Sequence, residues 1–180
     1  MKNCGSVGFS LDRKEDIERL KAAITINGFD KSRFTIQVVV GATEEWKLEQ
    51  ILDAADEAGF HVLLLGYKTT GRGASVIPHQ YDWTEVVKRL KNEDRLPTLG
   101  IDTALAAGSI QQLTAMGIPS WMYTTKEGAF SCYVDAVEMK IGPSSYGDPS
   151  EMVPLVGKDP KKNPAPEHDQ ILAAFESFQK

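Results

Sequence analysis

Apolar residues along this chain follow two alternating periods. Short apolar runs rich in β-branched residues and leucine predict strands over residues 6–11, 34–40, 61–65 and 97–101. Each run is followed by a segment in which apolar residues recur three or four positions apart, which predicts an amphipathic helix. Strands that alternate with helices indicate right-handed crossovers and a parallel sheet, so the expected fold class is α/β.

Residues typical of helix ends bound these segments. Helix N-termini are expected at Asp12, Thr43, Asp82 and Ser109, whose side chains can accept hydrogen bonds from unpaired backbone N–H groups. Gly59 is expected to end the helix over residues 44–58. The unbroken apolar run within residues 34–40 favours a strand that is covered on both faces, as in many parallel sheets.

The pattern changes after Pro119. Residues 121–124 and 130–137 flank Lys126-Glu127-Gly128 and are expected to pair as a β-hairpin. Residues 149–166 are rich in proline and lysine and predict a loose segment, and residues 169–178 predict a last amphipathic helix. We therefore expect a partial barrel with a hairpin over residues 1–148, and a tail with a helix over residues 149–180.

The number of strand–helix units limits the architecture. A complete (β/α)₈ barrel takes about 250 residues, whereas this chain has 180 residues. The sheet is therefore expected to be an open partial (β/α) barrel of about four parallel strands, with a C-terminal β-hairpin and a terminal helix.

Composition narrows the classes of function. The formal net charge is −5 and no basic stripe occurs, which argues against binding to nucleic acid or to anionic membranes. No apolar run is long enough to span a bilayer. The two cysteines, Cys4 and Cys132, are too few for a disulfide framework or a four-thiolate metal site. A reducing cytoplasm is the expected location.

Several segments resemble one protein family. VGFSLD at residues 7–12, VVGATE at 39–44 and LLGYK at 64–68 are similar to strand-end segments in the C-terminal half of radical S-adenosylmethionine (SAM) enzyme barrels. Residues 71–73 resemble the loop after the third of these strands, and residues 130–146 resemble the hairpin that follows the barrel. The second segment is similar to the family's G-x-I-x-G-x-x-E strand, although Gln37 replaces the first glycine.

The resemblance implies a cleft for SAM at the carboxyl ends of the strands. A polar side chain of the first segment, Ser10 or Asp12, would meet the ribose, and the strand leading to Gly41 and Glu44 would lie along the adenine. The family holds a [4Fe–4S] cluster through a C-x-x-x-C-x-x-C loop, which this sequence lacks. The resemblance thus implies either one piece of a split or truncated enzyme, or a descendant that kept the SAM cleft but no longer binds the cluster and so no longer cleaves SAM.

Each of these candidate residues also has a purely structural interpretation. Asp12 suits a helix N-cap, and the Ser10 hydroxyl can be satisfied by neighbouring backbone. Glu44 is a favourable acid in the first turn of a helix whether or not a ligand binds beside Gly41. Both interpretations stay open for these positions.

Further candidates lie after the third and fourth predicted strands. Lys68 and Arg72 belong to a glycine-bearing loop, where two cations can hold a carboxylate or phosphate or simply be solvated. Asp102 follows the fourth strand, either as a cleft residue or as a helix cap. The glycines of the loop match neither a P-loop nor a dinucleotide-binding fingerprint.

The leading hypothesis is a radical-SAM-related half-barrel that holds part of an adenosine-binding cleft for SAM. It would be catalytic only if a partner chain supplied a cluster-bearing N-terminal half. The alternative is a non-enzymatic protein that binds a nucleotide-like small molecule or docks on a partner, such as a second copy, through an unpaired strand edge. The cleft requires Ser10, Gly41, Lys68 and Asp102 to gather at one edge of an open sheet.

Overall fold

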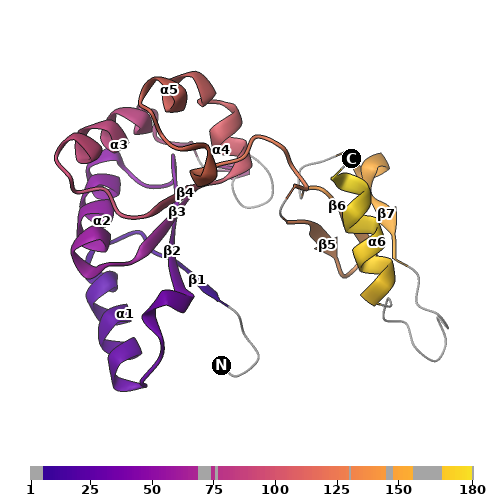
Figure 1. The fold of residues 1–180 in the computed structure, drawn as a ribbon, viewed down its shortest axis with the longest axis horizontal. Coiled ribbons are helices and arrows are strands. Elements are labelled where there is room, and N and C mark those ends of the chain that lie inside the picture. Colours follow the sequence, from indigo (N-terminus) through magenta and orange to yellow (C-terminus); the bar gives the residue numbers. More distant parts are fainter. Residues whose placement is uncertain are drawn as a thin grey trace. The chain divides into compact units, whose positions relative to one another are not determined.

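The chain is divided into two units between Thr125 and Lys126. The computed structural model describes residues 6–68, 74–75, 77–129, 131–144, 148–155 and 168–179 (Figure 1). This division differs from the one expected after residue 148, because strands on either side of that position pair with each other in the second unit.

A four-stranded parallel sheet forms the centre of the first unit. Its strands are β1 (Val7–Ser10), β2 (Phe34–Val39), β3 (His61–Leu65) and β4 (Leu99–Ile101), in the spatial order β1-β2-β3-β4. All three neighbouring pairs are parallel. The expected α/β fold with an open sheet of four parallel strands is therefore confirmed, and its assignment to a partial barrel stays a prediction.

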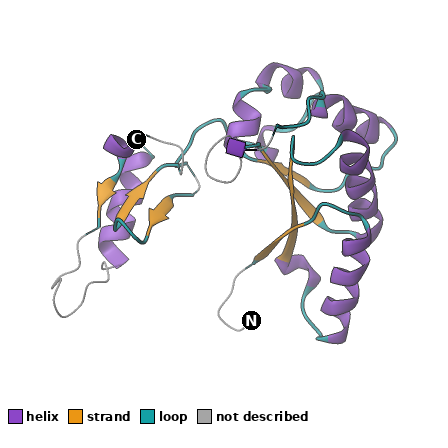
Figure 2. Ribbon diagram, turned by 180° about the vertical axis from the view of Figure 1, so that it is seen from behind, coloured by secondary structure: helices purple, strands orange, loops and turns teal. Residues whose placement is uncertain are grey.

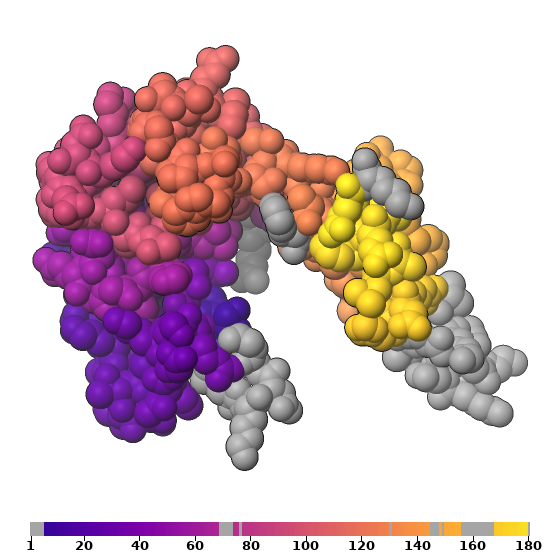
Figure 3. Space-filling model, viewed as in Figure 1, coloured from indigo at the N-terminus to yellow at the C-terminus, as the bar shows by residue number. Residues whose placement is uncertain are grey.

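Three helices cover one face of this sheet. Helices α1 (Glu15–Ile26), α2 (Glu45–Ala58) and α3 (Trp83–Asn92) lie side by side, with α2 in the middle, in both ribbon views (Figures 1 and 2). Their side chains form one continuous outer surface, coloured from indigo to magenta in Figure 3. The 3₁₀ turn η1 (Lys31–Arg33) precedes β2. Two short helices, α4 (Thr103–Ala107) and α5 (Ile110–Ala115), follow β4.

The two faces of the sheet differ in burial. Residues that point toward the helices are buried and apolar: Phe34, Ile36, Val38, Val62, Leu64, Leu99 and Ile101. The alternate residues form what we call the open face, namely Gly8, Ser10, Thr35, Gln37, Val39, His61, Leu63, Leu65 and Gly100. Every residue of the open face is at least partly exposed. The expectation that β2 is covered on both faces was therefore wrong, because only alternate residues of this strand are buried.

The helix ends agree only in part with the sequence prediction. Asp82 caps α3 by accepting a hydrogen bond from the Thr84 N–H at 3.0 Å, and Gly59 ends α2 in the left-handed conformation, as expected. The cap positions of α1 and α2 are instead occupied by Lys14 and Glu44, and neither side chain makes a cap hydrogen bond. The assignments of Asp12 and Thr43 as N-caps were therefore wrong.

The second unit contains a small antiparallel sheet and a terminal helix. Strands β5 (Tyr133–Asp135), β6 (Lys140–Gly142) and β7 (Val153–Pro154) pair in that order, with the 3₁₀ turn η4 (Pro149–Glu151) before β7. Helix α6 (His168–Phe178) packs on β6 around the buried side chains Ile141, Leu155 and Ala174. The predicted C-terminal hairpin and terminal helix are confirmed.

Only one of the two predicted strands takes part in the hairpin, since β5 lies within residues 130–137. Of residues 121–124, the first two belong to the 3₁₀ turn η3 (Ser120–Met122), and Tyr123 forms an isolated parallel bridge with Ile101 in the first unit. The hairpin instead joins β5 to β6, and the Asp135 carboxylate holds its turn by accepting hydrogen bonds from the N–H groups of Val137 and Glu138. These two bonds hold the pKa of Asp135 below its usual value. In the described part of the chain, no helix combines the length and the apolar character that a bilayer span requires.

Two adjacent leucines of β3 test the difference between the faces. Leu64 is fully buried under the helices, whereas Leu63 lies on the open face and is half-buried. We predict that Leu64→Ala lowers the free energy of unfolding by about 2–5 kcal/mol, because it leaves a cavity in the core. Leu63→Ala is the matched control and should cost less than half as much. Urea unfolding of the two variants measures both values, and equal losses would contradict a sheet with one covered face.

Candidate functional site

The parallel register brings several predicted residues to one edge of the sheet. Ser10 ends β1, Gly41 follows β2, Lys68 follows β3 and Asp102 follows β4, and all four strands run in the same direction. Carboxyl ends of parallel strands are where α/β proteins collect their ligand-binding groups. We therefore take this carboxyl edge, with the adjoining open face, as the candidate site. Arg72 lies outside the described residues.

The turn after β2 is built around Gly41. Its φ angle of +90° is one that only glycine adopts without strain. The N–H groups of Ala42 and Thr43 both donate to the Val39 carbonyl, at 3.2 and 3.1 Å, which folds the chain back sharply before α2. The sequence pointed correctly to a glycine turn at this position.

The space beside Gly41 is occupied by the chain itself. A Cβ atom at this position would lie 3.2 Å from the Cβ of Tyr67 and 3.4 Å from the Cβ of Pro78. The sequence interpretation was that glycine here lets a ligand approach the backbone. The structure supplies a different reason for glycine, which is close packing of the segments that follow β3.

Two hydrogen bonds from the segment over residues 77–81 hold this turn in place. The His79 N–H donates to the Gly41 carbonyl at 2.8 Å, and the Tyr81 hydroxyl donates to the Thr43 carbonyl at 2.9 Å. Burial raises the pKa of Tyr81 above its ordinary value, which already lies well above neutral pH, and the protonated hydroxyl is the donor in this bond. The role of Tyr81 has no signal in the sequence, because the pattern does not show that a residue before α3 reaches back to the turn after β2.

The carboxylates of the edge serve mainly as structural groups. One Asp102 oxygen accepts a hydrogen bond from the Leu105 N–H at 2.8 Å and so caps α4, which bears out the alternative interpretation of this residue. Glu44 lies 3.3 Å from the Lys47 ammonium, one turn along α2. Both carboxylates therefore have partners within the first unit.

The two candidates at the end of β1 differ in where they lie. Ser10 is exposed on the open face, where it pairs in register with Gln37. Asp12 follows the strand, and its side chain is 82 % exposed, 3.6 Å from the Arg13 guanidinium. Ser10 therefore lies next to a polar side chain of the sheet, that of Gln37, whereas Asp12 lies beyond the end of the strand.

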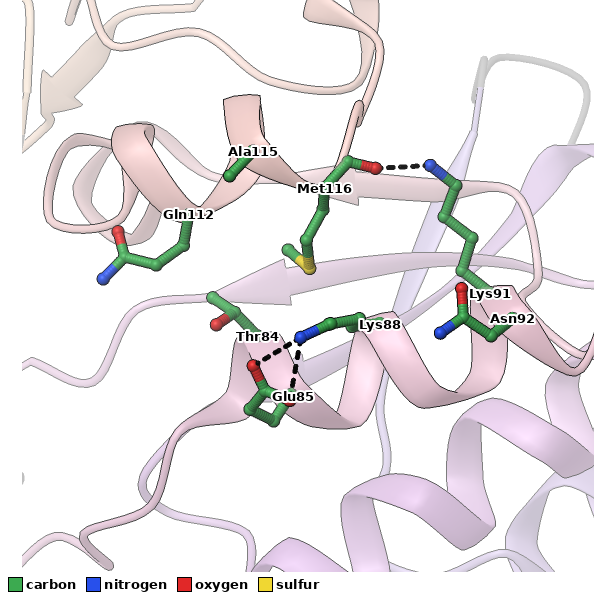
Figure 4. Close-up of a pocket in the computed structure, with 8 residues that line it drawn as sticks. All are labelled: Thr84, Glu85, Lys88, Lys91, Asn92, Gln112, Ala115 and Met116. Atoms are coloured by element: carbon green, nitrogen blue, oxygen red, sulfur yellow. Dashed lines mark hydrogen bonds and ion pairs between the residues drawn. The ribbon is translucent and has the colours of Figure 1, made fainter.

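A second concave surface, which the sequence did not indicate, lies on the helical layer between α3 and α5 (Figure 4). It has a volume of about 350 Å³ and is lined by Thr84, Glu85, Lys88, Lys91, Asn92, Gln112, Ala115 and Met116. Lys88 is paired with Glu85 at 3.2 Å, and Lys91 donates to the backbone carbonyls of Met116 and Gly117. Its cations are thus used within the protein, and this groove is a weaker candidate for recognising a charged ligand.

The chain's own residues do not fit a [4Fe–4S] cluster held by three thiolates. The sequence has two cysteines, of which Cys132 is half-buried beside β5 in the second unit, and Cys4 lies outside the described residues. Among the residues that the structure describes, no three His, Cys, Asp or Glu side chains are grouped to hold a metal ion.

Comparison with known proteins gives no independent assignment. No protein family, no curated protein and no solved structure matches this chain significantly.

Two glycines with positive φ angles test the account of the Gly41 turn. We predict that Gly41→Ala lowers the free energy of unfolding by about 2–4 kcal/mol, since it adds steric overlap with Tyr67 and Pro78 to the backbone strain. Gly28 also has a positive φ, +62°, but a Cβ there would have no atom within 4 Å. Gly28→Ala should therefore cost about 1 kcal/mol. Equal losses in urea unfolding would show that Tyr67 and Pro78 do not confine Gly41.

Proposed function

We propose that this chain binds an adenosine-bearing small molecule, SAM being the first candidate, on the open face at the carboxyl edge of its parallel sheet. The observation that carries the proposal is the row Ser10, Gln37, Leu63 and Gly100, which crosses all four strands in register. This row combines a hydroxyl, an amide, an apolar side chain and a glycine, and each member is at least partly exposed. Small-molecule sites typically combine an apolar surface with a few fixed polar groups.

The strand-end resemblance supports adenosine as the chemical class. Its three segments, residues 7–12, 39–44 and 64–68, fall at the ends of the adjacent strands β1, β2 and β3. In this proposal Ser10, with Asp12 beyond it, faces the ribose, and the end of β2 lies along the base. Lys68, Arg72, Glu44 and Asp102 are proposed to form the polar rim.

The proposal makes this chain a binding component rather than a complete enzyme. A SAM-cleaving cluster requires three thiolates, and two cysteines cannot supply them. Catalysis would therefore depend on a cluster-bearing partner chain, and we derive no reaction step for this chain alone. We place the protein in the cytoplasm, which its low cysteine content supports.

Ligand binding can be tested with the full chain and S-adenosylhomocysteine, a stable probe that keeps the adenosine. We expect a saturable rise in melting temperature, because a ligand at 100 times its Kd stabilises the folded state by about 2.7 kcal/mol. Guanosine at the same concentration is the control and should shift the melting temperature less. Absence of a saturable shift at millimolar probe would contradict the proposal.

The edge of β1 supports docking on a partner as a second candidate function. Among the described strands, β1 pairs with β2 alone. The Leu11 N–H donates to the Gln37 carbonyl, so the Ser10 N–H, one residue earlier, points to the unpaired side. An unpaired strand edge can accept a strand from another chain.

Light scattering tests whether that partner is a second copy. If it is, the molar mass in solution should be about twice 19.8 kDa and should return to the monomer value in Ser10→Pro, which removes the outward N–H. Ser10→Ala keeps this N–H and is the matched control. A wild-type monomer would exclude self-association through β1, and an equal effect of both variants would exclude the backbone as its cause.

A further inference from the structure

The side chain of Gln37 has an unusual position in the centre of the open face. Its amide lies over Gly8 of the neighbouring strand, where a Cβ atom would overlap the Gln37 Nε2 and lie only 2.7 Å from its Cδ. Glycine at position 8 therefore makes the space into which the Gln37 side chain folds. The two positions are two residues apart in register, since Ser10 is the direct partner of Gln37.

The Gln37 amide has no hydrogen-bond partner among the described residues. The residue is half-buried in a central strand, and its strand neighbours Ile36 and Val38 are fully buried on the opposite face. A carboxamide carries two donors and an acceptor, and because no unpartnered side-chain polar atom of the described residues is buried, those of Gln37 reach the surface of the open face. Its donors and acceptor are therefore available to a molecule on the open face.

Leu63, the partner of Gln37 in β3, leans in the other direction. Its Cδ1 lies 3.2 Å from the position that a Cβ of Gly100 would take, so the side chain folds toward β4. Gln37 folds toward β1, at the other side of the sheet. The two central side chains thus lean apart over glycines of the two outer strands, with an amide toward one side of the open face and an apolar group toward the other.

We propose that Gln37 recognises the edge of the adenine base and that Leu63 packs against the base. A carboxamide can donate to N7 and accept from the N6 amine of adenine at the same time, which guanine and hypoxanthine do not allow in the same orientation. Gly8 acts as a positioning residue, because it keeps the amide folded down. The inference rests on the proposed function and adds to it the residue that selects the base.

The test compares adenosine with inosine, which lacks the N6 amine, by calorimetric titration of the full chain. We expect wild type to bind adenosine at least 5-fold more tightly than inosine, in the range of one amide–base contact. Gln37→Leu, of similar size, should bind both nucleosides with equal affinity. Gly8→Ala should reduce the preference in the same way, because the new Cβ displaces the amide. Thr35→Ala, on the same face but one row away, is the control and should keep the preference.

The outcomes separate this inference from the proposed function. If wild type binds neither nucleoside, the proposed function fails and the role of Gln37 fails with it. If wild type binds adenosine but Gln37→Leu keeps the preference, only the role of Gln37 is overturned. Should either variant fail to fold, the side-chain NH₂ resonances of Gln37 in wild type decide: adenosine should shift them more than inosine does, and equal shifts would overturn the inference.

Discussion

Burial of one face of the parallel sheet is the constraint from which the rest of the first unit follows. Ile36 and Val38 of β2, with Val62 and Leu64 of β3, are buried almost completely beneath the helices. Because side chains alternate along a strand, this burial turns Gln37 and Leu63 to the opposite face. The parallel register then aligns Ser10, Gln37, Leu63 and Gly100 in one row and gathers the strand ends at one edge.

The carboxyl edge is organised by the chain's own contacts before any ligand is considered. Tyr67 and Pro78 fill the space beside Gly41, and Tyr81 holds the Thr43 carbonyl. Asp102 is engaged as the cap of α4. These contacts fix the turns that frame the site, and they leave the adjoining open face as the surface where uncommitted polar groups remain.

Periodicity predicted the strands and major helices of the first unit, since their apolar spacing reflects burial that the structure shows. It failed where contacts between residues far apart in the sequence determine the local structure. Residues 121–124 looked like a strand from composition, but Tyr123 is held by a single bridge to Ile101. The capping of α4 by Asp102 was one of two interpretations that the sequence left open. Neither the hydrogen bond of Tyr81 to the turn after β2 nor the folding of Gln37 over Gly8 has a local signal, because each joins residues that are far apart in the sequence.

The central claim is that a ligand binds the open face of the sheet and not its helical layer. Methyl NMR during titration with S-adenosylhomocysteine tests it most directly, because Leu63 and Leu64 are adjacent in sequence but lie on opposite faces. The account predicts large shift changes for the Leu63 methyl groups and small ones for Leu64 and for Met116, which lines the groove between α3 and α5. Saturable changes at Met116 with none at Leu63 would contradict it.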